Sequence, residues 1–163
     1  MRDAPPAPAR RSLGQWVNDT FGVDDPWVRP RPSIERRDVV LALVVALVGL
    51  VSLELVRSFG SLDEHTDASP WIQRLAVLSG ALILVGRRRW PLIVALVMAG
   101  HMIVVGVTMP LVMSQFTLQG VYFIAFLTAV AWAQDRRAMV AVVGIIVIVM
   151  FAWIALQFAV GNS

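Results

Sequence analysis

Two residue types are missing from this sequence of 163 residues, which contains no cysteine and no lysine. Without cysteine the chain cannot form disulfides, bind a metal through thiolates or use a cysteine nucleophile. Because lysine is absent, all fourteen basic residues are arginine, and the formal net charge is +3. A basic balance can indicate nucleic-acid binding, but these arginines lie beside apolar runs instead of forming a soluble basic face. We therefore expect no nucleic-acid partner and interpret the arginines as determinants of membrane topology.

Motifs that carry catalysis or bind cofactors are also missing. The sequence has no glycine-rich phosphate loop, nucleophile elbow or zinc-protease motif, so we predict a protein that is not an enzyme and binds no cofactor. His101 is a solitary histidine in an apolar run and cannot supply both axial ligands of a bis-histidine haem. His65 lies among Asp63, Glu64 and Asp67, but four metal ligands at fixed geometry are not evident. We expect a solvated loop there rather than a metal site.

Long apolar runs make up most of what is present. Hydrophobic residues are 58% of the chain, whereas ordinary globular proteins hold about 45 to 50%. A helix of about 20 apolar residues spans a hydrocarbon core of about 30 Å. We therefore predict an all-α integral membrane protein of the cell membrane, a bundle of about five transmembrane helices in contact with the lipid bilayer. The predicted spans lie at about 38–59, 71–86, 91–109, 116–133 and 138–160, with Pro110 ending or bending the third.

Arginines between these runs orient the predicted bundle. Arg87-Arg88-Arg89-Trp90-Pro91 separates the second and third spans, and arginine-rich loops stay on the cytoplasmic side. Trp90 suits the headgroup layer, and Pro91 suits the first turn of the next helix. Four further arginines flank the first and fifth spans and follow the same rule: Arg36, Arg37, Arg136 and Arg137. We predict that the N-terminus is cytoplasmic and that the C-terminus lies outside.

Residues 1–37 are polar and rich in proline and arginine, and we predict that they form a cytoplasmic arm that can bind a cytoplasmic protein. Pro5, Pro6 and Pro8 favour disorder or polyproline II. From Ser12 the pattern indicates a short amphipathic helix over residues 12–22, because Ser12 and Gln15 have the spacing of a capping box. Two interpretations stay open for this helix: it lies in the membrane interface, or it is a weakly ordered part of a linker.

Ionisable residues inside the predicted spans are the candidate functional residues, because such groups are costly at membrane depth. Glu54 and Arg74 lie near the outer ends of the first two spans and are close enough in depth to pair. Such a pair either holds the two helices in register or senses a ligand or proton. Arg57 is expected to pair with Glu54 or to extend outward. His101, near the middle of the third span, either donates a hydrogen bond to a neighbouring helix or titrates as a sensor.

Small residues recur every four positions along the fourth span, at Ala125, Ala129 and Ala133. They form a ridge against which another helix can approach closely. Packing within the chain is the first interpretation, and a homodimer through this face is the alternative. Four methionines in and after the third span are interpreted as adaptable packing: Met98, Met102, Met109 and Met113.

Several short segments carry a family resemblance. They are Glu35-Arg36-Arg37-Asp38-Val39-Val40-Leu41-Ala42, the acidic Glu54, Arg87-Arg88-Arg89-Trp90-Pro91-Leu92, and a fourth span that passes from aromatic to small residues before Arg136-Arg137. Together they resemble the N-terminal membrane region of actinobacterial two-component sensor histidine kinases. The similarity covers about residues 35–160, and its most characteristic part is the arginine-tryptophan-proline turn. In that family a dimerisation helix with the phosphorylated histidine and an ATP-binding domain follow the membrane region.

The sequence contains no counterpart of those two kinase elements, and the predicted topology would need a further span before them. Either the chain is a fragment of a longer kinase, or it is a stand-alone relative without kinase chemistry. The resemblance implies a signalling input module that relays an envelope or membrane cue by small helix displacements. A structural or accessory subunit that recruits partners through its arm is the second hypothesis. A small transporter is the third, and it is disfavoured because no inverted repeat or matched pair of broken helices is visible.

Overall fold

The computed structural model describes residues 12–15, 33–60 and 68–161, and within these ranges the chain is helical and contains no strand. The helices are α2 (Arg36–Ser58), α3 (Pro70–Ile83), the short 3-10 helix η1 (Leu84–Gly86), α4 (Pro91–Thr108), α5 (Pro110–Met113), α6 (Phe116–Trp132) and α7 (Arg136–Gly161). Among the described residues, three helical segments are long and apolar enough to cross a membrane: α2, α4 and residues 136–153 of α7. The other two apolar helices, α3 with η1 and α6, are shorter.

When η1 is counted with α3, the helix bounds lie within two residues of the predicted spans. Two of the helices begin before the apolar run because a polar residue caps their first turn. Glu35 and Asp38 form a reciprocal capping box at the start of α2. The Oδ1 atom of Asp135 accepts hydrogen bonds from the N–H groups of Arg137 and Ala138 at the start of α7. Capping thus extends each helix into its charged flank.

Proline sets the boundary between α4 and α5. Met109 leaves the helical conformation, with φ −144° and ψ 65°, and Pro110 begins α5. The expected connection between the third and fourth spans therefore contains one helical turn. Proline is favoured at the first position of a helix because its missing N–H would have no partner there. Pro91 and Pro70 begin α4 and α3 in the same way.

Parts of two predictions lie outside the described residues. In the arm, the structure describes residues 12–15, where Gln15 N donates to Ser12 Oγ at 3.2 Å and Ser12 N donates to Gln15 Oε1 at 3.1 Å. The predicted capping box is therefore present. The remainder of the amphipathic helix over 12–22, and the loop with His65, are not described.

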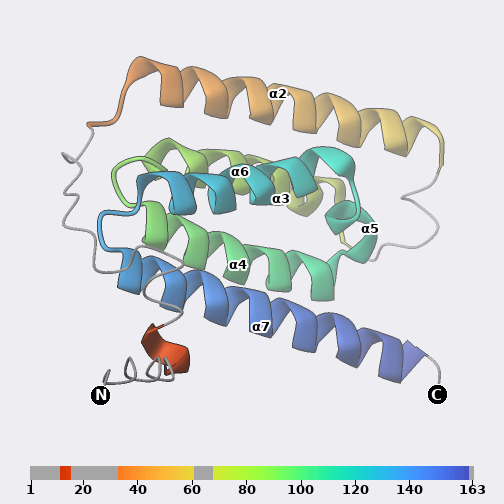
Figure 1. The fold of residues 1–163 in the computed structure, drawn as a ribbon. Coiled ribbons are helices and arrows are strands. Elements are labelled where there is room, and N and C mark those ends of the chain that lie inside the picture. The colour runs from red at the N-terminus through yellow and green to blue at the C-terminus, as the bar shows by residue number, and fades with distance from the viewer. Residues whose placement is uncertain (1–11, 16–32, 61–67, 162–163) are drawn as a thin grey trace, which may run out of the picture.

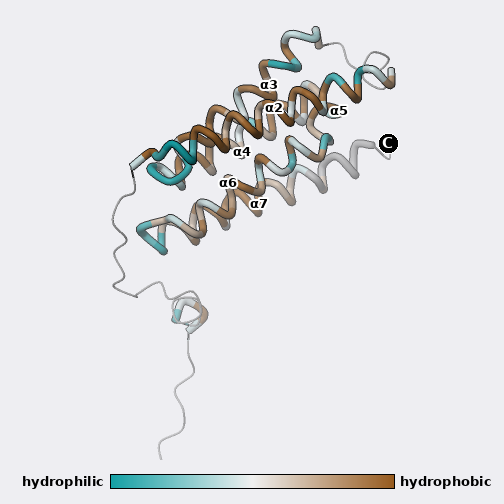
Figure 2. Tube along the Cα trace, turned by 90° about the horizontal axis from the view of Figure 1, so that it is seen from above, coloured by the Kyte–Doolittle hydropathy of each residue, from teal (hydrophilic) through white to brown (hydrophobic). Residues whose placement is uncertain are grey.

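Helices α2, α3, α4, α6 and α7 run side by side in alternating directions, with α2 and α7 on opposite flanks of α3, α4 and α6 (Figure 1). Hydrophilic residues gather toward the helix ends and apolar residues fill the middle (Figure 2). Helix α4 packs most extensively against α6, and α2 against α3. The centre of the core contains Leu53, Met98, Met102, Leu118 and Tyr122, each almost completely buried.

The outer surface of α2 is apolar rather than polar. Leu43, Leu47, Val51 and Leu55 recur every four residues and are 65%, 64%, 60% and 55% exposed. Water-soluble monomers rarely expose contiguous apolar surfaces of this kind. Their outward position is the arrangement expected for a helix that contacts lipid.

The alanine ridge of α6 faces the interior of the bundle. Ala125 and Ala129 have no exposed surface, and Ala129 packs in a cluster with Ala95 of α4 and Ile146 of α7. This is the close helix approach that small residues permit. The chain's own helices therefore cover Ala125 and Ala129, whereas Ala133, the third residue of the predicted face, follows the last residue of α6 and is partly exposed.

Candidate functional site

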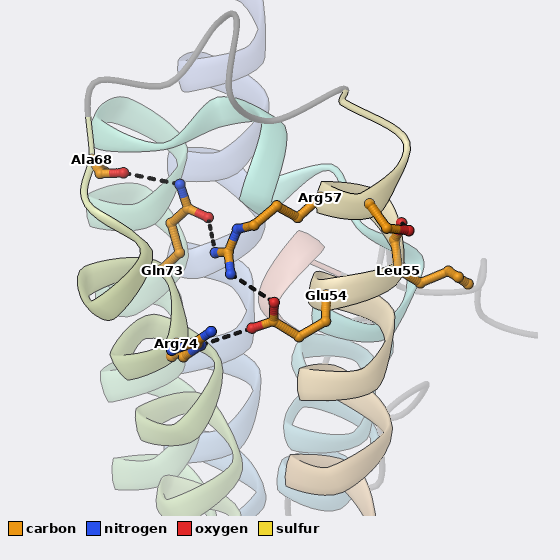
Figure 3. Close-up of polar contacts among 7 residues, drawn as sticks. Glu54, Leu55, Arg57, Ala68, Gln73 and Arg74 are labelled. Atoms are coloured by element: carbon orange, nitrogen blue, oxygen red, sulfur yellow. Dashed lines mark hydrogen bonds and ion pairs between the residues drawn. The ribbon is translucent and has the colours of Figure 1, made fainter.

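Glu54 connects the ends of α2 and α3 that lie opposite the arginine-rich turns. Its Oε1 atom lies 2.7 Å from Arg74 Nε on α3, and its Oε2 atom lies 2.8 Å from Arg57 Nη1 on α2 (Figure 3). The predicted contact between Glu54 and Arg74 is therefore present. Arg57 also pairs with Glu54, as one of its two predicted alternatives stated.

Gln73 completes this group of residues, which we call the opposite-end cluster (Glu54, Arg57, Gln73 and Arg74). Its Oε1 atom accepts a hydrogen bond of 2.7 Å from Arg57 Nη2, and its Nε2 atom donates to the Ala68 carbonyl at 2.9 Å (Figure 3). Gln73 is 2% exposed. The Arg57 Nε atom is buried and has no hydrogen-bond partner among the described residues. Arg57 thus lies between the helices and does not extend outward.

The opposite-end cluster is open on one side. The side chains of Glu54 and Arg74 are 45% and 36% exposed, whereas that of Arg57 is 15% exposed. The guanidinium carbon of Arg74 lies 5.6 Å from the ring centre of Trp71, which is itself largely exposed. The half-exposed ion pair of Glu54 and Arg74 is thus accessible to solvent, whereas Gln73 behind it is buried.

His101 lies apart from that cluster and joins three helices at the middle of the bundle. Its Nδ1 atom is 3.1 Å from the Tyr122 hydroxyl on α6. Its Nε2 atom is 2.9 Å from Ser79 Oγ and 3.1 Å from the Ala76 carbonyl, both on α3. Ser79 Oγ also donates to the Ala76 carbonyl at 3.0 Å. The predicted hydrogen bond from His101 to a neighbouring helix therefore has a counterpart on both α3 and α6.

Asp38 is the buried centre of a second charged group, the arginine-end cluster (Glu35, Asp38, Arg87 and Arg88). Its side chain has no exposed surface, and Oδ1 lies 3.1 Å from Arg87 Nε and 3.0 Å from Arg88 Nε. Arg88 Nη1 lies 3.2 Å from Glu35 Oε2. Burying a carboxylate is tolerated only when partners compensate its charge. Two of the arginines assigned to topology therefore also hold the start of α2 against the turn before α4.

The remaining arginines assigned to topology lie at the same end of the bundle. Figure 1 places the start of α2, the turn at residues 87–90 and the start of α7 together at one end. Arg36, Arg37 and Arg89 are exposed there. Arg88 reaches across this end to α6, where its guanidinium carbon lies 5.2 Å from the ring centre of Trp132. The structure thus gathers at one end the arginines that the sequence distributes over three segments.

Reasoning from sequence missed Asp38, Gln73, Ser79 and Tyr122 as functional candidates. The spacing of Glu35 and Asp38 is that of a capping box, which was a usable signal for the start of α2. Tyr122 is the single tyrosine of the chain and lies in an apolar run, where its hydroxyl needs a partner. No comparable signal marks Gln73 or Ser79, because either side chain can also bond to its own helix.

No family model, curated protein or solved structure matches this chain. The candidate sites therefore stand on their geometry alone. Within the described ranges, no group of three or more histidine, aspartate or glutamate side chains is placed to hold a metal ion.

Proposed function

We propose that this chain is a membrane-embedded input module that relays a change at one membrane surface to the other. In this proposal the helices α2, α3 with η1, α4, α6 and α7 each cross the bilayer, and the N-terminus is cytoplasmic. The observation that carries the proposal is that α2 is joined by ion pairs at both of its ends, to α3 through Glu54 and Arg74 and to the turn after η1 through Asp38 and Arg87. One ion-pair group is half-exposed, and the other surrounds a carboxylate with no exposed surface.

The distribution of arginine supports the proposed orientation. Seven arginines of the described part lie at the arginine end, on the start of α2, the turn at 87–90 and the start of α7 (Figure 1). The two at the other end, Arg57 and Arg74, are both paired with Glu54. Cytoplasmic loops carry an excess of arginine and lysine, so the arginine end is proposed to be cytoplasmic.

The proposed mechanism uses α2 and α3 as a coupled pair. A change in the charge of Glu54 would release Arg74 and alter the contact between these helices at the outer end. Their axes approach closely in between, since a Cβ atom on Gly49 of α2 would lie 2.6 Å from Val77 Cγ1 on α3. A displacement of α3 would then reach Arg87 and the buried carboxylate of Asp38. Packed helices of this kind favour discrete arrangements over continuous deformation.

The orientation can be tested by labelling single cysteines, because the natural chain has none. Ser33→Cys precedes α2 at the arginine end, and Ser114→Cys follows α5 at the other; both positions are exposed. In intact cells we expect a membrane-impermeant maleimide to label position 114 and not position 33. Labelling of position 33 alone would invert the proposed orientation.

Coupling across the bundle can be tested by measuring distances between spin labels in nanodiscs. One label is placed at Ser33→Cys and the other at Ala141→Cys, an exposed position in the second turn of α7. We expect Glu54→Gln to shift the distance distribution at this end, and Leu55→Ala, its exposed neighbour, to leave it unchanged. Identical distributions for the unmodified and Glu54→Gln backgrounds would contradict the relay, because a two-state element must respond to a change at the input.

A structural or accessory membrane subunit is a second candidate function, favoured by the outer face of α7. Ile145, Ile148 and Phe151 are 58%, 69% and 69% exposed and offer an apolar surface to another membrane protein. In this alternative the arm over residues 1–33 also recruits partners. Deleting the arm distinguishes the two functions. If the chain is an accessory subunit, the deletion should abolish co-purification of its partners. If it is an input module, the deleted chain should still show the change in spin-label distance caused by Glu54→Gln.

A further inference from the structure

A pocket of about 220 Å³ lies at the arginine end, between the turn that begins α4 and the turn that joins α6 to α7. Its lining includes Arg88, Arg89, Trp90, Trp132, Gln134 and Asp135. The residues come from two segments, 88–93 and 132–135, that are at least 39 positions apart in the sequence, so the pocket exists only in the folded bundle. None of the three polar contacts of His101 belongs to it.

Two arginines of this pocket are stacked on indole rings. The guanidinium carbon of Arg88 lies 5.2 Å from the ring centre of Trp132, and that of Arg89 lies 5.1 Å from the ring centre of Trp90. Stacking holds the planar group while its N–H edge stays available for bidentate hydrogen bonds to an oxyanion. Arg88 already contacts the carboxylates of Asp38 and Glu35. Arg89 is exposed and, among the described residues, has no carboxylate partner.

The charge around the pocket favours an anion. In the described part of this end, seven arginines face three carboxylates, those of Glu35, Asp38 and Asp135, which leaves four positive charges in excess. The carboxylates of Glu35 and Asp38 belong to the arginine-end cluster, and Asp135 Oδ1 caps α7. The amino end of α4, which begins at Pro91, adds the positive end of an 18-residue helix dipole.

The surface beside the pocket is apolar and continues along α4. Ile93 both lines the pocket and is 59% exposed, and Leu96 and Val97 follow it at 47% each. Trp90 is 49% exposed at the rim, and half-exposed tryptophan is typical of the headgroup layer. A ligand that fits both the basic pocket and the apolar surface of α4 beside it has an anionic head and apolar chains.

We propose that this pocket binds the phosphate of an anionic phospholipid, with Arg89 as the main hydrogen-bond donor and the acyl chains along α4. Basic pockets between transmembrane helices bind such headgroups in other proteins. The inference requires that the helices cross a bilayer, but it does not require that the bundle senses a cue. It assigns to Arg89 a role in ligand recognition beyond topology.

The test starts from the full chain in nanodiscs. After delipidation, native mass spectrometry measures which lipids the protein retains. Phosphatidylglycerol is compared with phosphatidylcholine, and inorganic phosphate and glycerol 3-phosphate are added as soluble competitors. We expect Arg89→Gln to reduce retained phosphatidylglycerol about tenfold, as the loss of a charge-assisted hydrogen-bond pair predicts. Arg36→Gln, an equal loss of charge at an exposed residue of the same end that does not line the pocket, should change retention less than twofold.

Three outcomes would overturn the proposal. Equal losses in Arg89→Gln and Arg36→Gln would show diffuse attraction to the membrane surface. Equal retention of phosphatidylcholine would show that the anionic head is not recognised. Full displacement by either soluble phosphate would show a site for a soluble anion.

Trp90→Leu keeps the charge and removes the stacking, so it should reduce the retained phosphatidylglycerol by a smaller factor of about three. Unchanged retention would contradict the role of the stacked pair.

A failed lipid assay would leave the cysteine-labelling pattern and the distance change of Glu54→Gln unaffected. Conversely, a bundle that does not relay any signal can still bind the lipid. The two proposals therefore fail separately.

Discussion

Asp38 and Arg87 lie 49 positions apart in the sequence, yet their Oδ1 and Nε atoms are 3.1 Å apart at the arginine end of the bundle. Asp38 has no exposed surface, and the Arg87 side chain is 17% exposed. A second arginine, Arg88, contacts the same carboxylate oxygen. Helix α2 is thus held to the turn between η1 and α4 by a carboxylate that has no exposed surface.

We predict that Asp38→Asn destabilises the bundle by about 3 kcal/mol, because breaking a buried ion pair leaves its partner charges uncompensated. Unfolding by denaturant in detergent micelles, followed by circular dichroism, measures this loss. Glu35→Gln is the matched control: its side chain is 47% exposed, and it should cost less than about 1 kcal/mol. Equal effects of the two variants would show that burial of Asp38 does not determine the cost.

Gln73 is predicted to matter more to stability than Arg74, although only Arg74 carries a charge. Gln73→Leu leaves the Arg57 NH2 group and the Ala68 carbonyl without their bonds in a buried site, which costs about 1 to 3 kcal/mol. Arg74→Gln removes a half-exposed ion pair and should cost about 1 kcal/mol or less. The same unfolding assay ranks them. A larger loss for Arg74→Gln would contradict this ranking.

The helices and their approximate ends were predictable because each depends on a local pattern. Apolar runs indicate the approximate helix ends, and a proline at the first position marks the start of α4. The capping box of Glu35 and Asp38 did not enter the prediction, so the first span was expected to begin two residues after the observed start of α2. The pair of Glu54 and Arg74 was also predictable, since two helices joined by a short loop bring equal depths together. The arginine-end cluster was not, because a buried acid is recognised only when its partners from a distant turn are placed beside it. The inward position of Ala125 agrees with the first interpretation of the alanine ridge, packing within the chain, because small residues at helical spacing permit a close helix approach.

The hydrogen bonds of His101 are predicted to contribute unequally. Tyr122→Phe removes the hydroxyl partner of Nδ1 at a site that is 3% exposed and should cost about 1 kcal/mol. Ser79→Ala should cost less than about 0.5 kcal/mol, because Nε2 keeps the Ala76 carbonyl at 3.1 Å. Unfolding in micelles compares the two variants. A larger loss for Ser79→Ala would show that the serine, and not the carbonyl, is the main partner of Nε2.

Trp153 of α7 covers Gly106 of α4, and this contact holds the two helices together. A Cβ atom on Gly106 would lie 2.7 Å from Trp153 Cη2 and 3.0 Å from Cζ2, so the indole or α7 itself must move. Gly106→Ala should therefore destabilise the bundle by about 1 to 3 kcal/mol, as overpacking does. Gly100→Ala in the same helix meets no atom within 4 Å and should be neutral or stabilising by up to about 1 kcal/mol, because alanine favours helices.

Combining Gly106→Ala with Trp153→Leu should cost less than the sum of the two single changes, because the smaller side chain relieves the clash. Strict additivity in the unfolding assay would show that α7 does not rest on Gly106.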